Sequence, residues 1–169
     1  MIAVTDSGPL IALAKLNHLH LLSTLYDDVL IPRAVYHEVV VVGQMRGYPD
    51  ADVLQVFLDN AGWQTTNVSK IPPALIGDIR LGKGEIEAIA LAWEHQTPLL
   101  LDEIYARAVA ERMGLASIGT LGVLVEAYRG GHLFAGGFAE LLATIESRND
   151  IWIHPSLCQR IRNDILGDL

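Results

Sequence analysis

The chain has 169 residues, of which 51% are hydrophobic and 19% are charged. This is enough for one domain with a buried core, and the composition is too apolar for intrinsic disorder. Twelve Lys and Arg against twenty Asp and Glu give a net charge of −8, whereas a protein that holds long nucleic acid by charge alone should be basic. Either nucleic acid is not the partner, or some of the carboxylates serve another purpose.

Two further classes are excluded by what the sequence lacks. The single cysteine, Cys158, rules out a disulfide framework and fits a reducing compartment, so we expect a cytoplasmic protein. There is no run of about 18 apolar residues that could span a membrane. The first residues, MIAVTDSG, also lack the basic and apolar segments of a secretory signal.

Short apolar runs alternate with helical patterns in the first half of the chain. Residues 2–5 form an apolar run typical of a buried strand, and Asp6 or Ser7 after it would cap a helix. The elements expected next are helices at 10–16 and 19–25, a strand at 28–31, a helix from Pro32 to about 42, a loop at 43–49, a helix at 51–60 and an edge strand at 63–68.

The second half continues this alternation after residues 71–83, which carry few signals. The expected elements are helix 85–95, strand 98–101, a helix to 113, strand 116–118, helices at 120–128 and about 138–147, an extended piece at 151–154 and a helix at 155–165. Such alternation indicates a parallel sheet covered on both faces. We therefore predict one α/β domain over residues 1–169, with a core over about 1–130 and a helical tail over 131–169.

Acidic residues follow two of the predicted strands. Asp6 comes directly after the first strand, and Asp102 and Glu103 come after the strand at 98–101. Open α/β sheets place their sites at the carboxyl ends of strands. Each acid taken alone is more often a helix cap, so position alone does not decide its role.

Two predicted helices carry a carboxylate toward the sheet. A wheel of about 100° per residue places Glu85 in the middle of an apolar face that includes Trp93, and turns Glu87 toward water. The same wheel places Glu38 among valines. An inward carboxylate costs several kcal/mol unless it is paired. The alternatives are an internal salt bridge, a favourable first-turn charge for Glu85, or a strand at 39–42, which would void the wheel for Glu38.

These acids could meet at one site, namely Asp6, Glu38, Glu85, and Asp102 or Glu103. Two like charges about 4 Å apart repel by about 4 kcal/mol at an effective dielectric constant of about 20, so such a cluster needs a cation. All-oxygen ligands favour Mg²⁺ or Mn²⁺. A carboxylate-held ion of this kind is typical of water attack on a phosphodiester.

Five blocks of sequence then carry a family resemblance: VTDSGPLIALAKL from Val4, LIPRAVYHE from Leu30, GEIEAIALA from Gly84, LLLDEIYARAVAERMG from Leu99 and GTLGVLVEA from Gly119. With them, the chain resembles PIN-domain proteins of the VapC-like toxin type, and especially a short prokaryotic subfamily catalogued as a domain of unknown function. The resemblance implies a three-layer α/β/α sandwich on a short, mainly parallel sheet, with a pocket of acids that binds Mg²⁺ or Mn²⁺.

The resemblance also assigns roles to residues. The catalytic acids it implies are Asp6, Glu38, Glu85, Asp102 and Glu103, and the first four are the expected metal ligands. The residues expected to assist them or to contact substrate are Ser7, Thr120 and Arg107, although Arg107 could equally be a solvated helix charge. The chain departs from the family pattern in having Glu85 where many PIN nucleases have Asp, and Leu101 where they have Thr.

The function implied is that of a metal-dependent single-strand endoribonuclease, the toxin of a toxin–antitoxin pair, which leaves 5′-phosphate and 3′-hydroxyl ends. The expected partners are single-stranded or structured RNA, an antitoxin protein and a second copy of the chain, with no membrane. The alternative is a catalytically weak PIN-like module that acts through protein or RNA partners, which the charge of −8 favours.

Overall fold

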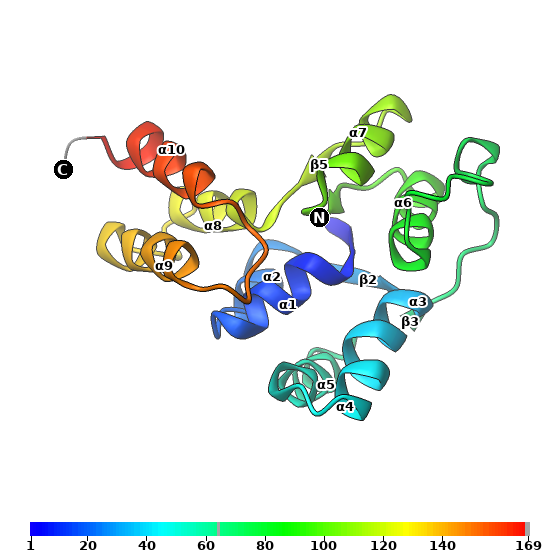
Figure 1. Cartoon of the computed structure of the whole chain (residues 1–169), viewed down its shortest axis with the longest axis horizontal. Coiled ribbons are helices and arrows are strands. Elements are labelled where there is room, and N and C mark those ends of the chain that lie inside the picture. The colour runs from blue at the N-terminus through cyan, green and yellow to red at the C-terminus, as the bar shows by residue number, and fades with distance from the viewer. Residues whose placement is uncertain (64, 168–169) are drawn as a thin grey trace.

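A parallel sheet of five strands lies at the centre of the computed structural model, which describes residues 1–63 and 65–167 (Figure 1). The strands are β1 (Ile2–Thr5), β2 (Asp28–Pro32), β3 (Thr65–Thr66), β4 (Leu99–Leu100) and β5 (Ser117–Ile118). Their order across the sheet is β3-β2-β1-β4-β5, and each neighbouring pair is parallel. The chain thus adds β2 and β3 on one side of β1, and then β4 and β5 on the other side.

Helices cover both faces of this sheet (Figure 1). They are α1 (Ser7–Lys15), α2 (His20–Leu25), α3 (Arg33–Tyr36), the π-helix η1 (His37–Val42), α4 (Gly43–Met45), α5 (Pro49–Ala61), the 3₁₀-helix η2 (Pro73–Leu75), α6 (Lys83–His95), α7 (Ile104–Arg112), α8 (Thr120–Arg129), α9 (Ala135–Ser147) and α10 (Pro155–Leu166). The predicted α/β/α architecture is therefore confirmed. No helix in the described part of the chain is long and apolar enough to cross a membrane.

Two hydrophobic cores lie on opposite faces of the sheet. Successive strand residues point to opposite faces, so Ala3 belongs to one core and Val4 to the other. The larger core takes side chains from α1, α2, α5, α8 and α9, and the smaller one from α6 and α7. Phe138 of α9 is fully buried in the larger core, so the predicted helical tail packs into the same core as the first helices.

Most predicted elements are present, and two differ. The predicted loop at 43–49 begins too early, because α4 continues the helix to Met45. The segment at 151–154, predicted as extended, lies outside any helix or strand. In the predicted edge strand at 63–68, β3 covers Thr65–Thr66 beside β2, and Gln64 lies outside the described residues.

The predicted helix from Pro32 to residue 42 changes its type on the way. It begins as α3 and continues as the π-helix η1, in which the backbone turns less per residue than in an α-helix. The wheel that placed Glu38 in the middle of a buried face therefore does not apply. Val39 and Val40 are the buried residues of this segment, whereas Glu38 is exposed to solvent.

Candidate active site

The first two predicted acids follow neighbouring strands at the point where the order of the sheet reverses. Asp6 follows β1 and Asp102 lies just beyond β4, and the backbone amide of Asp6 donates a hydrogen bond to the carbonyl of Leu100 at 2.9 Å. The chain leaves β1 toward β2 and leaves β4 toward β5, in opposite directions along the sheet, which opens a crevice at the carboxyl ends of the strands. Both acids therefore lie where α/β proteins usually build their sites.

Asp6 is the buried acid of this region. It occupies the N-cap position of α1, but its carboxylate accepts no capping hydrogen bond, and only 7% of the residue is exposed. It lines a cavity of about 600 Å³ between α6 and the α3–η1 segment. The lining residues of the cavity are Asp6, Ser7, Arg33, Ala34, His37, Glu38, Val42, Gly82, Lys83, Gly84, Glu85 and Glu87.

Glu38 reaches the cavity from η1 and is oriented by Ser7. The Ser7 hydroxyl donates a hydrogen bond to Oε2 of Glu38 at 2.9 Å. Gly84, at the start of α6, lies between this carboxylate and Asp6. A Cβ atom at Gly84 would lie 3.3 Å from Oδ1 of Asp6 and 3.3 Å from Oε2 of Glu38. The absence of a side chain at Gly84 therefore lets the two carboxylates face each other across the backbone of α6.

Glu85 is both a favourable charge in the first turn of its helix and an acid that faces the cavity, so both interpretations of this residue in the sequence apply. It stands in the first turn of α6, where its carboxylate accepts a hydrogen bond from the amide of the N-cap residue Gly82 at 2.6 Å. The same half-buried carboxylate lines the cavity of Asp6. Burial raises the pKa of Glu85, and the negative charges of Glu103 and Glu38 raise it further, while the Gly82 amide opposes the rise.

Glu87 does not point to water, contrary to the helical wheel. It is half-buried and accepts a hydrogen bond from the amide of Ala34 at 2.8 Å, at the N-terminus of α3. Pro32 precedes that helix and offers no side chain that could cap it, so a carboxylate from another element takes this place. The wheel is also wrong for Trp93, which is 41% exposed rather than packed on the sheet.

Basic side chains of the cavity wall were not predicted as site residues. Arg33 of α3, His37 of η1 and Lys83 of α6 line the cavity with the acids. Lys83 lies 4.0 Å from Glu87, one turn along the same helix. The pattern of residues at strand ends does not point to them, because each lies at the start of a helix or in η1.

For Glu87 the sequence holds one signal. Pro32 cannot cap the helix that follows it, so a carboxylate from another element is expected there.

Asp102 is held on the other side of the crevice by Thr120. Its Oδ1 accepts the Thr120 amide at 2.7 Å and its Oδ2 accepts the Thr120 hydroxyl at 2.6 Å, so it lies at the N-terminus of α8. A Cβ atom at Gly119 would lie 2.9 Å from Oδ1 of Asp102 and 3.1 Å from Nη1 of Arg107. Arg107 and Asp102 therefore meet over Gly119, and Asp102 lines two surface grooves instead of the cavity of Asp6.

Glu103, the alternative to Asp102, is an exposed helix cap. Its carboxylate accepts the amide of Ala106 at 2.6 Å at the start of α7. Its charge raises the pKa of Glu85, which places the two carboxylates within electrostatic reach. Asp102 is thus the acid fixed by two hydrogen bonds at the end of β4, and Glu103 stabilises the helix that follows.

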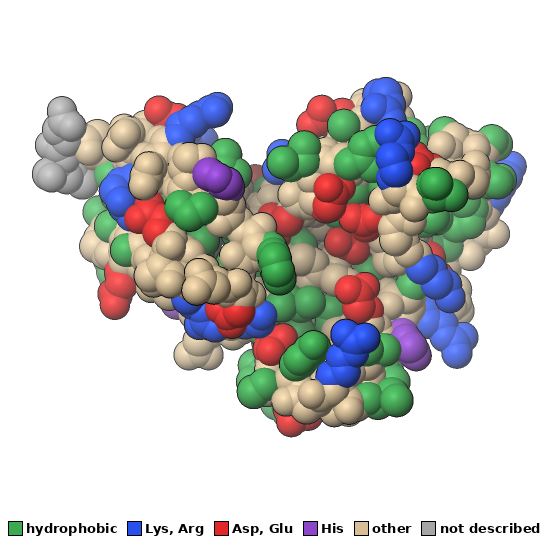
Figure 2. All heavy atoms as spheres, in the orientation of Figure 1, with side chains coloured by type: hydrophobic (Ala, Val, Ile, Leu, Met, Phe, Trp, Pro, Cys, Tyr) green, Lys and Arg blue, Asp and Glu red, His purple; other side chains and the backbone are tan. Residues whose placement is uncertain are grey.

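In the described part of the chain the acids of the crevice form no close ion pair, although Arg107 lies near Asp102 over Gly119. Figure 2 shows acidic side chains gathered in the middle of one face, over the region between α3, α6 and α7. In the described ranges 1–63 and 65–167, none of Asp6, Glu38, Glu85, Asp102 and Glu103 forms an ion pair within 4.0 Å. Burial, and then the charges of Glu85 and Glu38, raise the pKa of Asp6 to about 7, although nearby backbone amides oppose this. Burial also raises the pKa of Asp102.

The donor set suits a hard divalent cation, but the acids do not form a closed cluster. Among the residues that the structure describes, no group of three or more His, Cys, Asp and Glu side chains lies close enough together to hold a metal ion. Asp6, Glu38 and Glu85 line one cavity while Asp102 lies outside it, so the expected four-acid cluster is not present. Mg²⁺ keeps several waters and is often held by one or two carboxylates, which these residues can supply. Their assignment as metal ligands stays a prediction.

Comparison with known proteins identifies a family. A family model described as a PIN domain matches residues 2–165 of the chain. No curated protein matches the chain.

Proposed function

The chain belongs to the PIN-domain family, whose members are generally nucleases, and from this premise we propose that it is a metal-dependent endoribonuclease that hydrolyses single-stranded RNA. The observation that carries the proposal is Asp6. This carboxylate is buried at the end of β1, faces two further acids in a cavity, and has no ion-pair partner within 4.0 Å among the described residues. Its pKa of about 7 leaves it only partly ionised at neutral pH, and a bound cation would favour the charged form.

The proposed ion is Mg²⁺ or Mn²⁺, held by Asp6 together with Glu38 or Glu85. When bound, such an ion polarises a phosphoryl oxygen and lowers the pKa of a bound water. Ser7 fixes the orientation of Glu38 through its hydroxyl. The basic residues on the cavity wall, Arg33 and Lys83, would attract the phosphate of a substrate toward the acids.

Asp102 and Arg107 would act on the other side of the scissile phosphate. Two hydrogen bonds from Thr120 hold the Asp102 carboxylate at the end of β4. Arg107 stands beside it over Gly119, where its guanidinium can contact a phosphate oxygen. In this arrangement Thr120 positions Asp102, and Glu103 contributes chiefly by capping α7.

The test is cleavage of a labelled single-stranded RNA by the purified chain. With Mn²⁺ or Mg²⁺ we expect cleavage that leaves 5′-phosphate ends and that a chelator stops. Asp6→Asn should lower the rate by at least about 100-fold, since changes even in residues that only support metal ligands cost about 10- to 100-fold. Cleavage that survives the chelator, or that Asp6→Asn leaves unchanged, would refute the proposal.

One observation favours a second candidate function, a PIN-like module without appreciable hydrolysis that acts through protein or RNA partners. In the described part of the chain, no three acids stand close enough to hold an ion. A module of this kind need not gain stability from Mn²⁺, whereas the proposed nuclease must. A thermal melt with and without Mn²⁺ separates the two candidates.

We also propose that the nuclease serves as the toxin of a toxin–antitoxin pair, as a homodimer bound by an antitoxin. The family likeness supports this proposal, because the VapC-like PIN proteins that the chain resembles have this role. Expression in a bacterial host should arrest growth, and Asp6→Asn should relieve the arrest. A growth arrest that Asp6→Asn does not relieve would contradict the toxin role.

A further inference from the structure

Trp152 is an aromatic side chain that the proposed chemistry leaves unused. It is 92% exposed, in the segment between α9 and α10. It lies where two surface grooves meet, one beside α1 and one between α7, α8 and α10, and Asp102 lines both of them. An exposed tryptophan next to an acid of the proposed active site is therefore a candidate contact for substrate.

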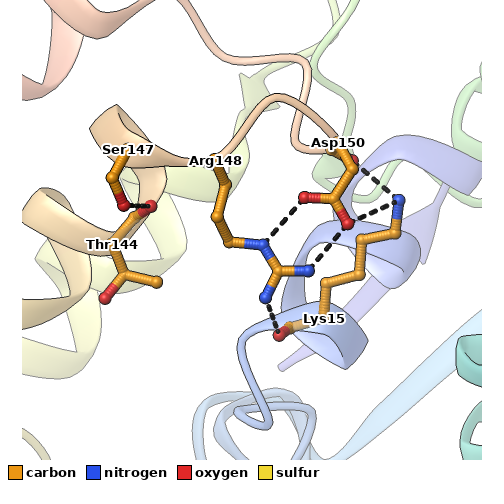
Figure 3. A network of polar contacts seen from close by, with 5 residues as sticks. All are labelled: Lys15, Thr144, Ser147, Arg148 and Asp150. Atoms are coloured by element: carbon orange, nitrogen blue, oxygen red, sulfur yellow. Dashed lines mark hydrogen bonds and ion pairs between the residues drawn. The ribbon is translucent and has the colours of Figure 1, made fainter.

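The backbone that carries Trp152 is fixed on both sides. Arg148 donates two hydrogen bonds to the carboxylate of Asp150, at 2.8 and 2.7 Å, and a third to the carbonyl of Lys15 at 3.0 Å (Figure 3). Lys15 in turn donates to the carbonyl of Asp150 at 2.7 Å. The next residue, Ile151, is only 5% exposed and packs into the larger core. The indole is thus presented to solvent on an anchored segment.

The groove between α7, α8 and α10 is lined by arginines. Arg107, Arg129 and Arg160 come from these three helices. Within residues 1–63 and 65–167, neither Arg107 nor Arg129 forms an ion pair within 4.0 Å, and Arg160 has only an exposed partner, Asp164, at 3.9 Å. This clustering of positive charge is unexpected in a chain of net charge −8.

Few acids oppose these arginines inside the groove. The acids that line it are Asp102 and Glu126. Thr120 donates two hydrogen bonds to Asp102, and the Tyr26 hydroxyl donates one to Glu126 at 3.0 Å. The groove therefore offers guanidinium groups and one aromatic face in a path that ends at the carboxyl end of β4.

We propose that this groove binds a single-stranded RNA segment that flanks the scissile phosphate, with a base stacked on Trp152 and phosphates on Arg107 and Arg129. Stacking on an exposed aromatic side chain requires an unpaired base, and a positive groove that follows the backbone complements it. The proposal rests on the proposed nuclease function. It adds where the substrate lies and why a single strand is preferred over a duplex.

The experiment measures binding without cleavage. A fluorescein-labelled oligouridylate of about ten nucleotides, within the usual site size of such grooves, is titrated with the chain in EDTA, and fluorescence anisotropy gives the dissociation constant. Trp152→Ala should weaken binding at least about five-fold, because a stacked base is lost. Trp93→Ala is the matched control, since this partly exposed tryptophan of α6 lines neither groove.

The arginines are tested by salt dependence. Arg107→Gln and Arg129→Gln should each reduce the slope of log K against log salt by about 0.7, the value expected when one phosphate contact to a single strand is lost. Arg112→Gln, an exposed residue of α7 outside the groove, should leave the slope unchanged. The thermal melt of Trp152→Ala should match that of the wild type, because Trp152 is 92% exposed.

The outcomes separate this proposal from the proposed function. If Trp152→Ala binds as tightly as the wild type, or if the wild type binds no oligonucleotide, the groove proposal is refuted even if RNA is cleaved. If binding depends on Trp152 and the arginines but Mn²⁺ supports no cleavage, the groove is a nucleic-acid site and the nuclease proposal fails alone.

Discussion

Two aspartates of this molecule have opposite surroundings. Asp6 is buried at the end of β1, next to Glu38 and Glu85 and without an ion-pair partner within 4.0 Å among the described residues. Asp150 is exposed and lies between Arg148 and Lys15. Burial raises the pKa of Asp6 to about 7, whereas the hydrogen bond from Arg148 and the charges of both cations hold the pKa of Asp150 well below its usual range.

The difference teaches which of the two carboxylates stabilises the fold. The charged form of Asp150 is more stable in the folded chain than in the unfolded chain, because its partners are cations, so this residue favours folding. Asp6 loses hydration and lies beside like charges, and the backbone amides of Ser7 and Gly8 compensate for only part of this, so the metal-free fold keeps it at a cost. A residue retained against stability is typical of a functional site. The predictions below test this contrast.

Asp102 tests the contrast most strongly, because it is half-buried and has hydrogen-bond partners, as Asp150 does. Asp102→Asn should lower kcat/KM for RNA by about 10- to 100-fold, as expected for a group that supports a metal-assisted site. Glu103→Ala should leave the rate near that of the wild type and reduce the free energy of unfolding by about 1 kcal/mol, through loss of the α7 cap. The opposite ranking in an RNA cleavage assay would make Glu103 the fourth acid.

The second prediction concerns metal. Mn²⁺ at about 100 times its dissociation constant should stabilise the fold by about 2.7 kcal/mol, which corresponds to about 5–10 °C in Tm for a domain of this size. Calorimetry should show the shift in the wild type and in Asp150→Asn, but not in Asp6→Asn. An equal shift in Asp6→Asn would mean that the ion binds elsewhere.

The third prediction is the pH dependence of the metal-free protein. The pKa of Asp6 is higher in the folded chain, about 7, than the ordinary value of 3.8, so the folded state binds more protons between these values. Stability should therefore fall as pH rises, by about 2 kcal/mol between about pH 5 and 7. Urea unfolding in EDTA should show this slope in the wild type.

In Asp6→Asn the slope should be reduced. The raised pKa values of Glu85 and Asp102 act in the same direction and remain in this variant, so the difference between the two proteins isolates Asp6. Identical slopes would mean that Asp6 is already charged, and paired, in the metal-free protein.

The smallest effect is expected at Asp150. Asp150→Asn should lower the free energy of unfolding by less than about 1 kcal/mol, because exposed ion pairs are screened by solvent. The pKa of Asp150 is lowered by folding, so its contribution is present above about pH 4 and is lost as pH falls further. The melting temperatures of variant and wild type should accordingly converge in acid. A loss that persists there would point to packing.

The architecture was readable from the sequence because apolar strands and helices alternate strictly. Even the two-residue strands β4 and β5 stand out, since each lies between a helix and an acid or a glycine. The π-helix η1 was not readable, because its run of valines fits a strand or an α-helix equally well. This segment packs against α5 and α1, and that tertiary context is not visible in the local sequence.

The site was readable in part. Acids at strand ends could be found because parallel strands end at a common edge, and this located Asp6 and Asp102. Which cavity each acid faces depends on distant partners, such as Thr120 for Asp102 and Ser7 for Glu38. Glu87 was misplaced for the same reason, since the amide of Ala34 draws it away from water.

Gly84 and Gly119 each leave room for a pair of charged side chains, which limits the substitutions that these two positions can accept. Any substitution at either codon adds at least one methyl group within 3.3 Å of a carboxylate oxygen. Gly136 and Gly137 of α9 have nothing within 4 Å of the same added atom. In a random library selected for activity, substitutions should therefore be tolerated at Gly136 and Gly137 and be rare at Gly84 and Gly119.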